Sequence, residues 1–101
     1  MDKIYKSLAD ENRRMILSIL KEGERNVNQI LGHLKIGQAT LSSHLQILRK
    51  AGLVSFQVKG KQRVYKLEKE SINNILKDIE KLVVNEDTRY DSEIIIRRIK
   101  F

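Results

Sequence analysis

The 101-residue sequence contains no cysteine, which excludes disulfide bonds, thiolate metal sites and cysteine-based catalysis. It has no proline and only five aromatic residues, so a hydrophobic core has to be built from Ile, Leu and Val. No run of apolar residues is longer than four, which is far too short for a membrane span, and no signal-peptide segment follows Met1. We therefore expect a soluble, cytoplasmic protein that forms a single domain over residues 1–101.

Positive charge is present in excess, with a net charge of +7, and the excess lies in the middle third of the chain. Between Lys35 and Lys66 there is no Asp or Glu, and the basic residues are Lys35, Arg49, Lys50, Lys59, Lys61, Arg63 and Lys66. The other 13 basic residues are matched by the 13 acidic residues of the chain. Such segregation favours a polyanionic partner over the alternative of a merely solvated face.

Apolar residues at helical spacing predict three helices before Gly37. Their apolar positions are Ile4, Tyr5 and Leu8; Met15, Ile16, Ile19 and Leu20; and Val27, Ile30, Leu31 and Leu34. Asp10 is the predicted N-cap of the second helix and Gly23 its end, while the third helix begins at Asn26 or Asn28. Residues 1–22 are thus expected to form two N-terminal helices.

A turn of Lys35–Gly37 and a fourth helix over Gln38–Lys50 complete a predicted helix-turn-helix within residues 26–52. Leu41, Leu45 and Leu48 form an apolar stripe that would face inward. The polar and basic residues outside this stripe are Gln38, Thr40, Ser42, Ser43, Gln46 and Arg49. The major groove of DNA admits one α-helix, and short hydroxyl and amide side chains can bond to base edges or phosphates. We therefore interpret these six residues as a DNA-binding set.

The residues that follow change from helical spacing to alternation, which predicts a β-hairpin within residues 53–68. Val54, Phe56 and Val58 alternate with polar residues, a turn spans Lys59–Gln62, and the returning strand carries Val64, Tyr65 and Leu67. Three basic residues, Lys59, Lys61 and Arg63, lie near the tip and could follow a DNA backbone or minor groove. The predicted fold class is mostly α with a β-hairpin wing: a winged helix-turn-helix.

Helical spacing returns in the C-terminal region, residues 70–101, with Ser71 as the predicted N-cap. One stripe carries Ile72, Ile75, Leu76, Ile79, Leu82 and Val83. This stripe could pack on the domain's own core, but so small a domain favours contact with a second copy. The segment Ile94–Phe101 fits a short helix or an added strand, and we favour the helix.

Three blocks of sequence resemble the ArsR/SmtB family of repressors between Leu8 and Leu67. They are LADENRRMIL from Leu8, GQATLSSHLQILRKAGLV from Gly37, and KGKQRVYKL from Lys59. The second block, which runs from helix to wing, is quite specific for the family. The resemblance implies a symmetric dimer held by the first and last helices, so that Ile4, Tyr5 and Leu8 join the dimer contacts. It also implies repression from a palindromic operator, with the base-reading positions taken by Gln38, Thr40, Ser42 and Ser43.

The sequence departs from the metal sensors of that family, which use cysteines on the third helix or His and acidic residues on the dimer helix. His33 and His44 are the only histidines, and none lies between Ser71 and Val84. A zinc site needs three or four donors, and His44 matches the family's helix-packing histidine. The acidic residues after Lys77 are expected on a solvated face. We therefore expect no metal and no cofactor.

The sequence thus predicts a homodimeric repressor that binds double-stranded DNA. Two routes of regulation stay open: an unidentified protein or small-molecule inducer, and autoregulation without any ligand. The alternative is an architectural or protein-interaction winged helix with weak DNA binding, which would more often expose apolar residues where this chain is polar. An enzyme is excluded, because the sequence offers no nucleophile–base pair, phosphate loop or clustered carboxylates.

Overall fold

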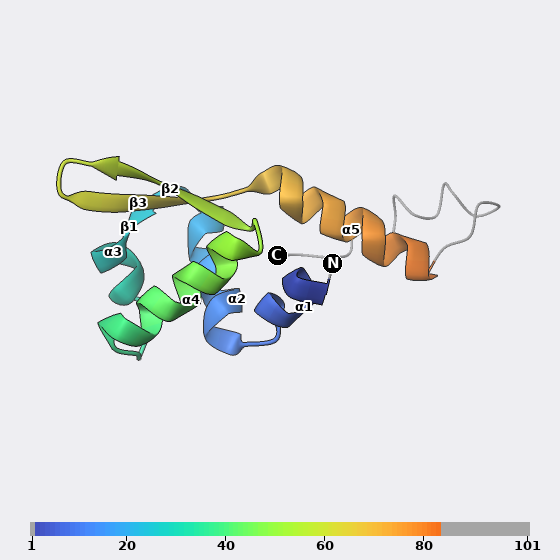
Figure 1. The fold of residues 1–101 in the computed structure, drawn as a ribbon, viewed down its shortest axis with the longest axis horizontal. Coiled ribbons are helices and arrows are strands. Elements are labelled where there is room, and N and C mark those ends of the chain that lie inside the picture. The colour runs from blue at the N-terminus through green and yellow to red at the C-terminus, as the bar shows by residue number, and fades with distance from the viewer. Residues whose placement is uncertain (1, 84–101) are drawn as a thin grey trace. The chain divides into compact units, whose positions relative to one another are not determined.

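The computed structural model describes residues 2–83 and divides the chain into two compact units, residues 1–68 and 69–101. The elements of the first unit are α1 (Asp2–Leu8), α2 (Glu11–Lys21), β1 (Arg25–Asn26), α3 (Val27–Leu31), α4 (Gln38–Lys50), β2 (Val54–Lys59) and β3 (Gln62–Leu67). The described part of the second unit is α5 (Lys69–Val83). The predicted class is confirmed: helices predominate, and a hairpin follows the helix-turn-helix (Figure 1). None of the helices within 2–83 is long and apolar enough to cross a membrane.

The core of the first unit is aliphatic and is centred on α2 and α4. Its buried apolar residues are Ile16, Leu17, Leu20, Ile30, Leu41, Leu45, Leu48, Leu53, Val54 and Tyr65. The three leucines of α4 face inward as predicted, which turns the polar side of this helix outward. Met15, one of the four apolar positions that predicted this helix, is 42% exposed, because Ile16, Leu17 and Leu20 form the buried stripe of α2.

The ends of α2 follow the predicted capping chemistry. Asp10 is the N-cap, and its Oδ1 accepts a hydrogen bond from the backbone N–H of Arg13 at 3.2 Å. The helix ends at Lys21, and Gly23 follows with a φ of +143°, a value that favours glycine. Both predicted boundaries of the second helix are therefore confirmed.

Of the two predicted starts of α3, Asn26 and Asn28, the structure has Asn26 as the N-cap. Asn26 Oδ1 accepts from the Gln29 backbone N–H, and Gln29 Oε1 accepts from the Asn26 backbone N–H, both at 2.8 Å. This reciprocal pair is a capping box. The helix is shorter than predicted: it ends at Leu31 with Gly32 as C-cap, and Leu34 lies in the turn before α4.

The sequence did not reveal β1, which turns the predicted hairpin into a three-stranded sheet of order β1-β3-β2. Arg25 pairs with Tyr65 and Asn26 with Val64, both antiparallel to β3. A strand of two residues is too short to show an alternating pattern. Because β1 leads directly into α3, its hydrogen bonds with β3 connect the hairpin to the start of the helix-turn-helix.

The hairpin itself is tighter at its tip than the predicted four-residue turn. Lys59 pairs with Gln62, so the turn proper is Gly60–Lys61, with Gly60 at a φ of +66°. Val58, one of the alternating apolar residues, is 66% exposed, because the hairpin extends beyond α3 and α4 (Figure 1). At the opposite end, Val54 is buried in the core.

The second unit's helix, α5, begins at Lys69, so the prediction that Ser71 is its N-cap is wrong. Helical geometry starts two residues earlier, where Glu70 places negative charge in the first turn. The apolar stripe has Ile75 buried, while Leu82 and Val83 are 80% and 65% exposed. The predicted helix over Ile94–Phe101 lies outside the described residues.

Candidate nucleic-acid interface

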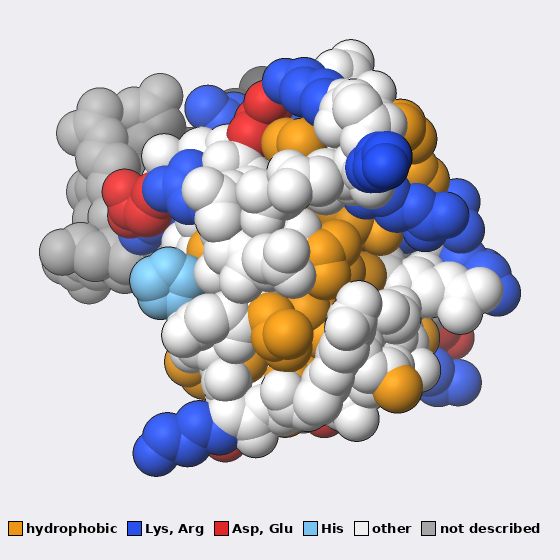
Figure 2. Space-filling view, turned by 90° about the vertical axis from the view of Figure 1, so that its left-hand side faces the viewer, with side chains coloured by type: hydrophobic (Ala, Val, Ile, Leu, Met, Phe, Trp, Pro, Cys, Tyr) orange, Lys and Arg blue, Asp and Glu red, His pale blue; other side chains and the backbone are white. Residues whose placement is uncertain are grey.

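A groove of about 700 Å³ lies between α4 and the hairpin, with the start of α3 as its third side. It is lined by Asn26, Val27, Asn28, Gln38, Ser42, Leu45, Gln46, Arg49, Lys61, Gln62, Arg63 and Tyr65. Ten of these side chains carry a polar or basic group and none carries an acid. In Figure 2, which faces this end of the molecule, Lys and Arg side chains lie around a central area of polar and apolar side chains. The groove therefore offers hydrogen-bonding groups and positive charge to a ligand.

Six of the nine predicted DNA-binding residues line this groove. Four come from α4 and two from the hairpin: Gln38, Ser42, Gln46 and Arg49, with Lys61 and Arg63. The α4 residues are separated by four, four and three positions, which places them on one face of the helix. The structure thus brings helix and hairpin residues that are more than ten positions apart in the sequence to a single surface.

The other two predicted residues of α4, Thr40 and Ser43, are exposed but do not line the groove. At 100° per residue, Thr40 lies about 200° from both Gln38 and Ser42, on the opposite flank of α4. Ser43 lies next to Ser42 and points away from the buried side of the helix. The sequence analysis did not separate these two positions from the other four, because it did not show which flank of α4 faces the hairpin.

The third residue outside the groove, Lys59, forms an ion pair with Glu24. The distance from Lys59 Nζ to Glu24 Oε2 is 3.2 Å, and both side chains are about half exposed. An exposed pair of this kind contributes little to folding stability. The pair does change the charge of the site, because the carboxylate of Glu24 partly neutralises Lys59, one of the three cations of the predicted hairpin tip.

Amide side chains on the third side of the groove were missed by the sequence analysis. Asn26 Nδ2 donates to Gln62 Oε1 at 3.1 Å, so one asparagine both caps α3 and holds a groove residue of β3. Asn28 lines the same side. Only the polarity of these residues could have drawn attention to them, since their proximity depends on the unpredicted pairing of β1 with β3.

Phe56 was also missed as a functional residue, because its alternation with polar neighbours indicated only a strand. The Cζ atom of Arg63 lies 4.6 Å from the centroid of the Phe56 ring, and that of Arg49 lies 5.7 Å from it. Both distances are within the range of cation–π interactions. One aromatic ring therefore contacts a guanidinium from the helix and another from the hairpin.

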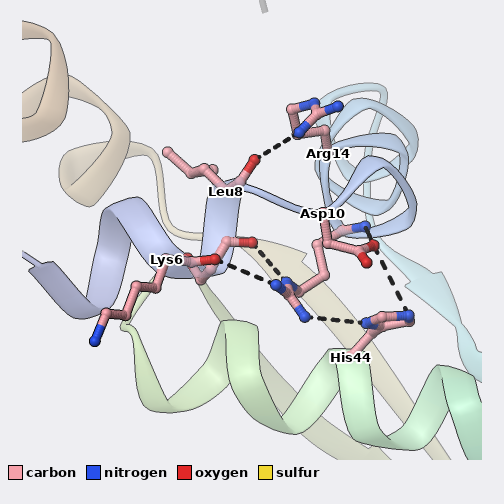
Figure 3. A network of polar contacts seen from close by, with 7 residues as sticks. Lys6, Leu8, Asp10, Arg14 and His44 are labelled. Atoms are coloured by element: carbon pink, nitrogen blue, oxygen red, sulfur yellow. Dashed lines mark hydrogen bonds and ion pairs between the residues drawn. The ribbon is translucent and has the colours of Figure 1, made fainter.

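His44 belongs to a polar network on the flank of α4 (Figure 3). Its Nδ1 lies 3.4 Å from Arg13 NH1, and because a guanidinium can only donate, Nδ1 is the acceptor. Its Nε2 faces Asp10 Oδ1 at 3.9 Å. Arg13 also donates from Nε to the Ser7 carbonyl at 2.6 Å and from NH2 to the Lys6 carbonyl at 3.2 Å. The contacts of His44 are thus with α2 and its cap, which fits the predicted helix-packing role.

The pKa of Asp10 is lowered from its usual value of 3.8. The main cause is the hydrogen bond that its carboxylate accepts from the backbone N–H of Arg13. Partial desolvation opposes this shift, while the nearby His44 and Arg13 side chains add to it. The carboxylate is consequently charged at neutral pH, and its negative charge interacts favourably with the positive N-terminal end of the α2 dipole.

The histidines and carboxylates of residues 2–83 form no group of three or more that could hold a metal ion. His33 lines a separate hollow of about 370 Å³ with apolar neighbours that include Met15 and Ile19. The two histidines therefore have different surroundings, as their spacing in the sequence suggested.

Comparison with known proteins gives matches over the same elements. Residues 10–55 match the model of the arsR family of bacterial regulatory proteins, from the cap of α2 to the start of β2. Transcriptional repressor SdpR of Bacillus subtilis is 35% identical over 85 residues, which cover 80% of this chain and 94% of the relative. The uncharacterized HTH-type transcriptional regulator MJ1325 of Methanocaldococcus jannaschii is 37% identical over 81 residues, covering 79% of this chain and 91% of the relative.

A solved structure shares the fold. The homodimeric winged helix-turn-helix DNA-binding domain of Mb0332 from Mycobacterium bovis, described as a possible ArsR-family regulator, superimposes with a TM-score of 0.68. It is 27% identical, and the match covers 89% of this chain and 81% of that one.

Proposed function

Because the chain belongs to the arsR family of DNA-binding transcriptional regulators, we propose that it is a homodimeric repressor that binds a palindromic operator in double-stranded DNA. The observation that carries this proposal is the acid-free groove between α4 and the hairpin. A helix in the major groove with a basic hairpin beside it accounts for both walls of the groove. As a regulator of transcription, the protein acts in the cytoplasm on DNA and has no catalytic role.

Three groove residues of α4, Gln38, Ser42 and Gln46, are proposed to read or approach base edges, and Arg49, Lys61 and Arg63 to contact the phosphate backbone. Amide side chains such as those of Gln38 and Gln46 can form two hydrogen bonds with adenine, whereas a serine can bond to several bases. We retain Thr40, Ser43 and Lys59 as additional DNA contacts of lesser weight. Their positions support contacts to neighbouring phosphates on the outer side of α4 and at the hairpin tip.

Dimerisation is proposed through α1 and α5, by way of the residues Ile4, Tyr5, Leu8, Ile72, Leu76, Ile79, Leu82 and Val83. Ile75, which was predicted with them, is already buried in the single chain at 1% exposure and is left out of the proposed contacts. Two observations support dimerisation: the Mb0332 domain is a homodimer, and Leu82 and Val83 expose apolar side chains at 80% and 65%. Exposed apolar clusters of this kind are typical of protein interfaces. A two-fold symmetric pair would present two copies of α4, which explains why the operator should be palindromic.

Release from DNA is proposed to depend on a protein or small molecule that acts at α5 and the residues after it. Such a ligand would change the relation between the two copies of α4 and thereby lower operator affinity. Zinc, copper or arsenite should have no such effect, because the chain offers no cysteine and only two separated histidines.

The proposal is tested by selecting bound sequences from a random duplex library and footprinting the enriched site. We expect an inverted repeat, protection of two successive major grooves, and a dimer by light scattering. The matched control is the variant with Gln38, Ser42 and Gln46 all changed to alanine, which should fold but enrich no sequence. Enrichment of no site by the unmodified protein, or of a site without symmetry, would contradict the proposal.

A further inference from the structure

Arg49 and Arg63 bring two positive charges close together without a carboxylate beside them. They come from different elements, the last turn of α4 and strand β3, and both line the groove. No ion pair involves either residue in the part of the chain that the structure describes, whereas Lys59 on the same hairpin is paired with Glu24. Two unpaired guanidinium groups near one point repel each other, so another contact has to hold them in place.

That contact is the ring of Phe56. The two guanidinium carbons lie 4.6 Å and 5.7 Å from its centroid, and the negative face of an aromatic ring attracts a cation. Arginine suits this arrangement better than lysine, because its planar group stacks on a ring and still leaves N–H donors free at its edge.

The ring is itself held against the core. Phe56 is directly opposite Tyr65 in the sheet, and their centroids are 5.3 Å apart at an interplanar angle of 42°. Tyr65 is only 4% exposed. Arg63 is two residues from Tyr65 and therefore on the same face of β3. A buried tyrosine, a half-buried phenylalanine and two exposed arginines thus form a continuous stack from the core to the groove.

We propose that Phe56 is a positioning residue for DNA binding: its ring holds Arg49 and Arg63 in place to contact neighbouring phosphates of one DNA backbone. This inference rests on the proposed function, because it takes the groove to be the surface that meets DNA. The stack joins the end of α4 to the hairpin, so it also fixes the spacing between the two elements that contact DNA. Holding both side chains before binding reduces the entropy lost when DNA arrives.

The ring is tested by measuring affinity for a random-sequence DNA duplex, because phosphate contacts do not depend on base sequence. Phe56→Leu should weaken binding about three- to tenfold, and Phe56→Tyr, which keeps the ring, should stay within about twofold of the unmodified protein. Gln57→Ala is the matched control: it lies on the same strand but on its other face, and should leave affinity unchanged.

A double-mutant cycle separates positioning from a general structural role. In a background of Arg49→Ala and Arg63→Ala, which itself lowers affinity, Phe56→Leu should cause no additional loss. An equal loss in both backgrounds would overturn the proposal, as would unchanged affinity for Phe56→Leu alone.

A second variant avoids any change at the half-buried ring. Replacing Arg49 and Arg63 together by lysine keeps both charges but removes the planar stack, and should reproduce the loss seen with Phe56→Leu. Full affinity of this lysine variant would overturn the proposal even if Phe56→Leu does not fold. Failure of the unmodified protein to bind any duplex would instead refute the proposed function and this inference with it.

Discussion

Two pairs of arginines in the first unit, Arg13 with Arg14 and Arg49 with Arg63, use the same guanidinium group in opposite ways. Arg13 donates to two backbone carbonyls and to His44, and Arg14 donates to the carbonyl of Leu8 at 2.8 Å (Figure 3). Arg49 and Arg63 have only an aromatic ring as a described partner. The first pair donates hydrogen bonds to backbone carbonyls where α1 meets α2. The second pair has its N–H donors available to a ligand. Residue type alone therefore does not indicate which arginines are available to a ligand.

The largest expected effect lies on the structural side of this comparison. Arg13→Ala should lower the free energy of unfolding by about 2–3 kcal/mol, because it removes charge-assisted hydrogen bonds and takes away the side-chain donor to the Ser7 carbonyl at the α1–α2 junction. The measurement is urea unfolding followed by circular dichroism. Arg49→Ala is the control and should change stability by less than about 0.5 kcal/mol. Similar losses for the two variants would remove the distinction between the pairs.

The next effect concerns base recognition by the groove face of α4. Gln38→Ala or Gln46→Ala should weaken binding to the selected operator by about 1–3 kcal/mol, with a much smaller loss on random DNA. Thr40→Ala, on the opposite flank of the same helix, should cost less than about 0.5 kcal/mol on either DNA. Fluorescence anisotropy on both duplexes provides the comparison. If Thr40→Ala were as damaging as Gln38→Ala, the groove face would not be the face that reads bases.

A smaller effect distinguishes free from paired cations on the hairpin. Changing Arg63 or Lys61 to alanine should lower the slope of log affinity against log salt by about one unit each, because each lost phosphate contact releases one counterion fewer. Lys59→Ala should lower it by less, since Glu24 already partly neutralises that charge. Glu24→Gln is the matched control and should raise affinity slightly. Equal slopes for all variants would place the hairpin outside the interface.

The smallest expected effect is the pH dependence that arises from Asp10. A carboxyl group whose pKa is lowered by folding stabilises the protein above its unfolded pKa, and this stabilisation is lost as pH falls through the folded value. For Asp10 the loss therefore occurs below about pH 3.8. Asp10→Asn keeps an N-cap acceptor but cannot titrate. Its melting temperature should consequently fall less steeply than that of the unmodified protein between neutral pH and acid, and a parallel fall would refute this role for Asp10.

Much of the fold could be predicted because its helices have distinct periodic patterns and clear ends. Asp10 and Gly23 set the limits of α2, and the leucines of α4 at spacings of three and four identified its buried side. Periodicity alone did not show which apolar residues are buried, because burial depends on tertiary contacts: Met15 lies at the edge of a stripe, and Val58 is too far along the hairpin to reach the core. The short strand β1 exists only because β3 is there to pair with it.

The candidate site was partly predictable for the same reason. Polar residues outside the leucine stripe and basic residues of the hairpin could be named from the sequence, and six of the nine lie together in the groove. The sequence could not indicate which flank of α4 faces the hairpin or that Glu24 pairs with Lys59 across 35 positions. Nor could it show that Phe56 contacts two arginines, because that depends on how the hairpin packs beside α4.

The two-residue tip of the hairpin determines how its length could change over evolutionary time. Since β2 and β3 are paired continuously up to Gly60–Lys61, two residues added to each strand would extend the hairpin by about 7 Å. The added residues would preserve the alternation of faces, whereas one residue added to each strand would reverse the faces of everything beyond it. If the hairpin contacts DNA as proposed, the stretch of DNA that it reaches can therefore lengthen in fixed steps while the sequence of α4 remains unchanged.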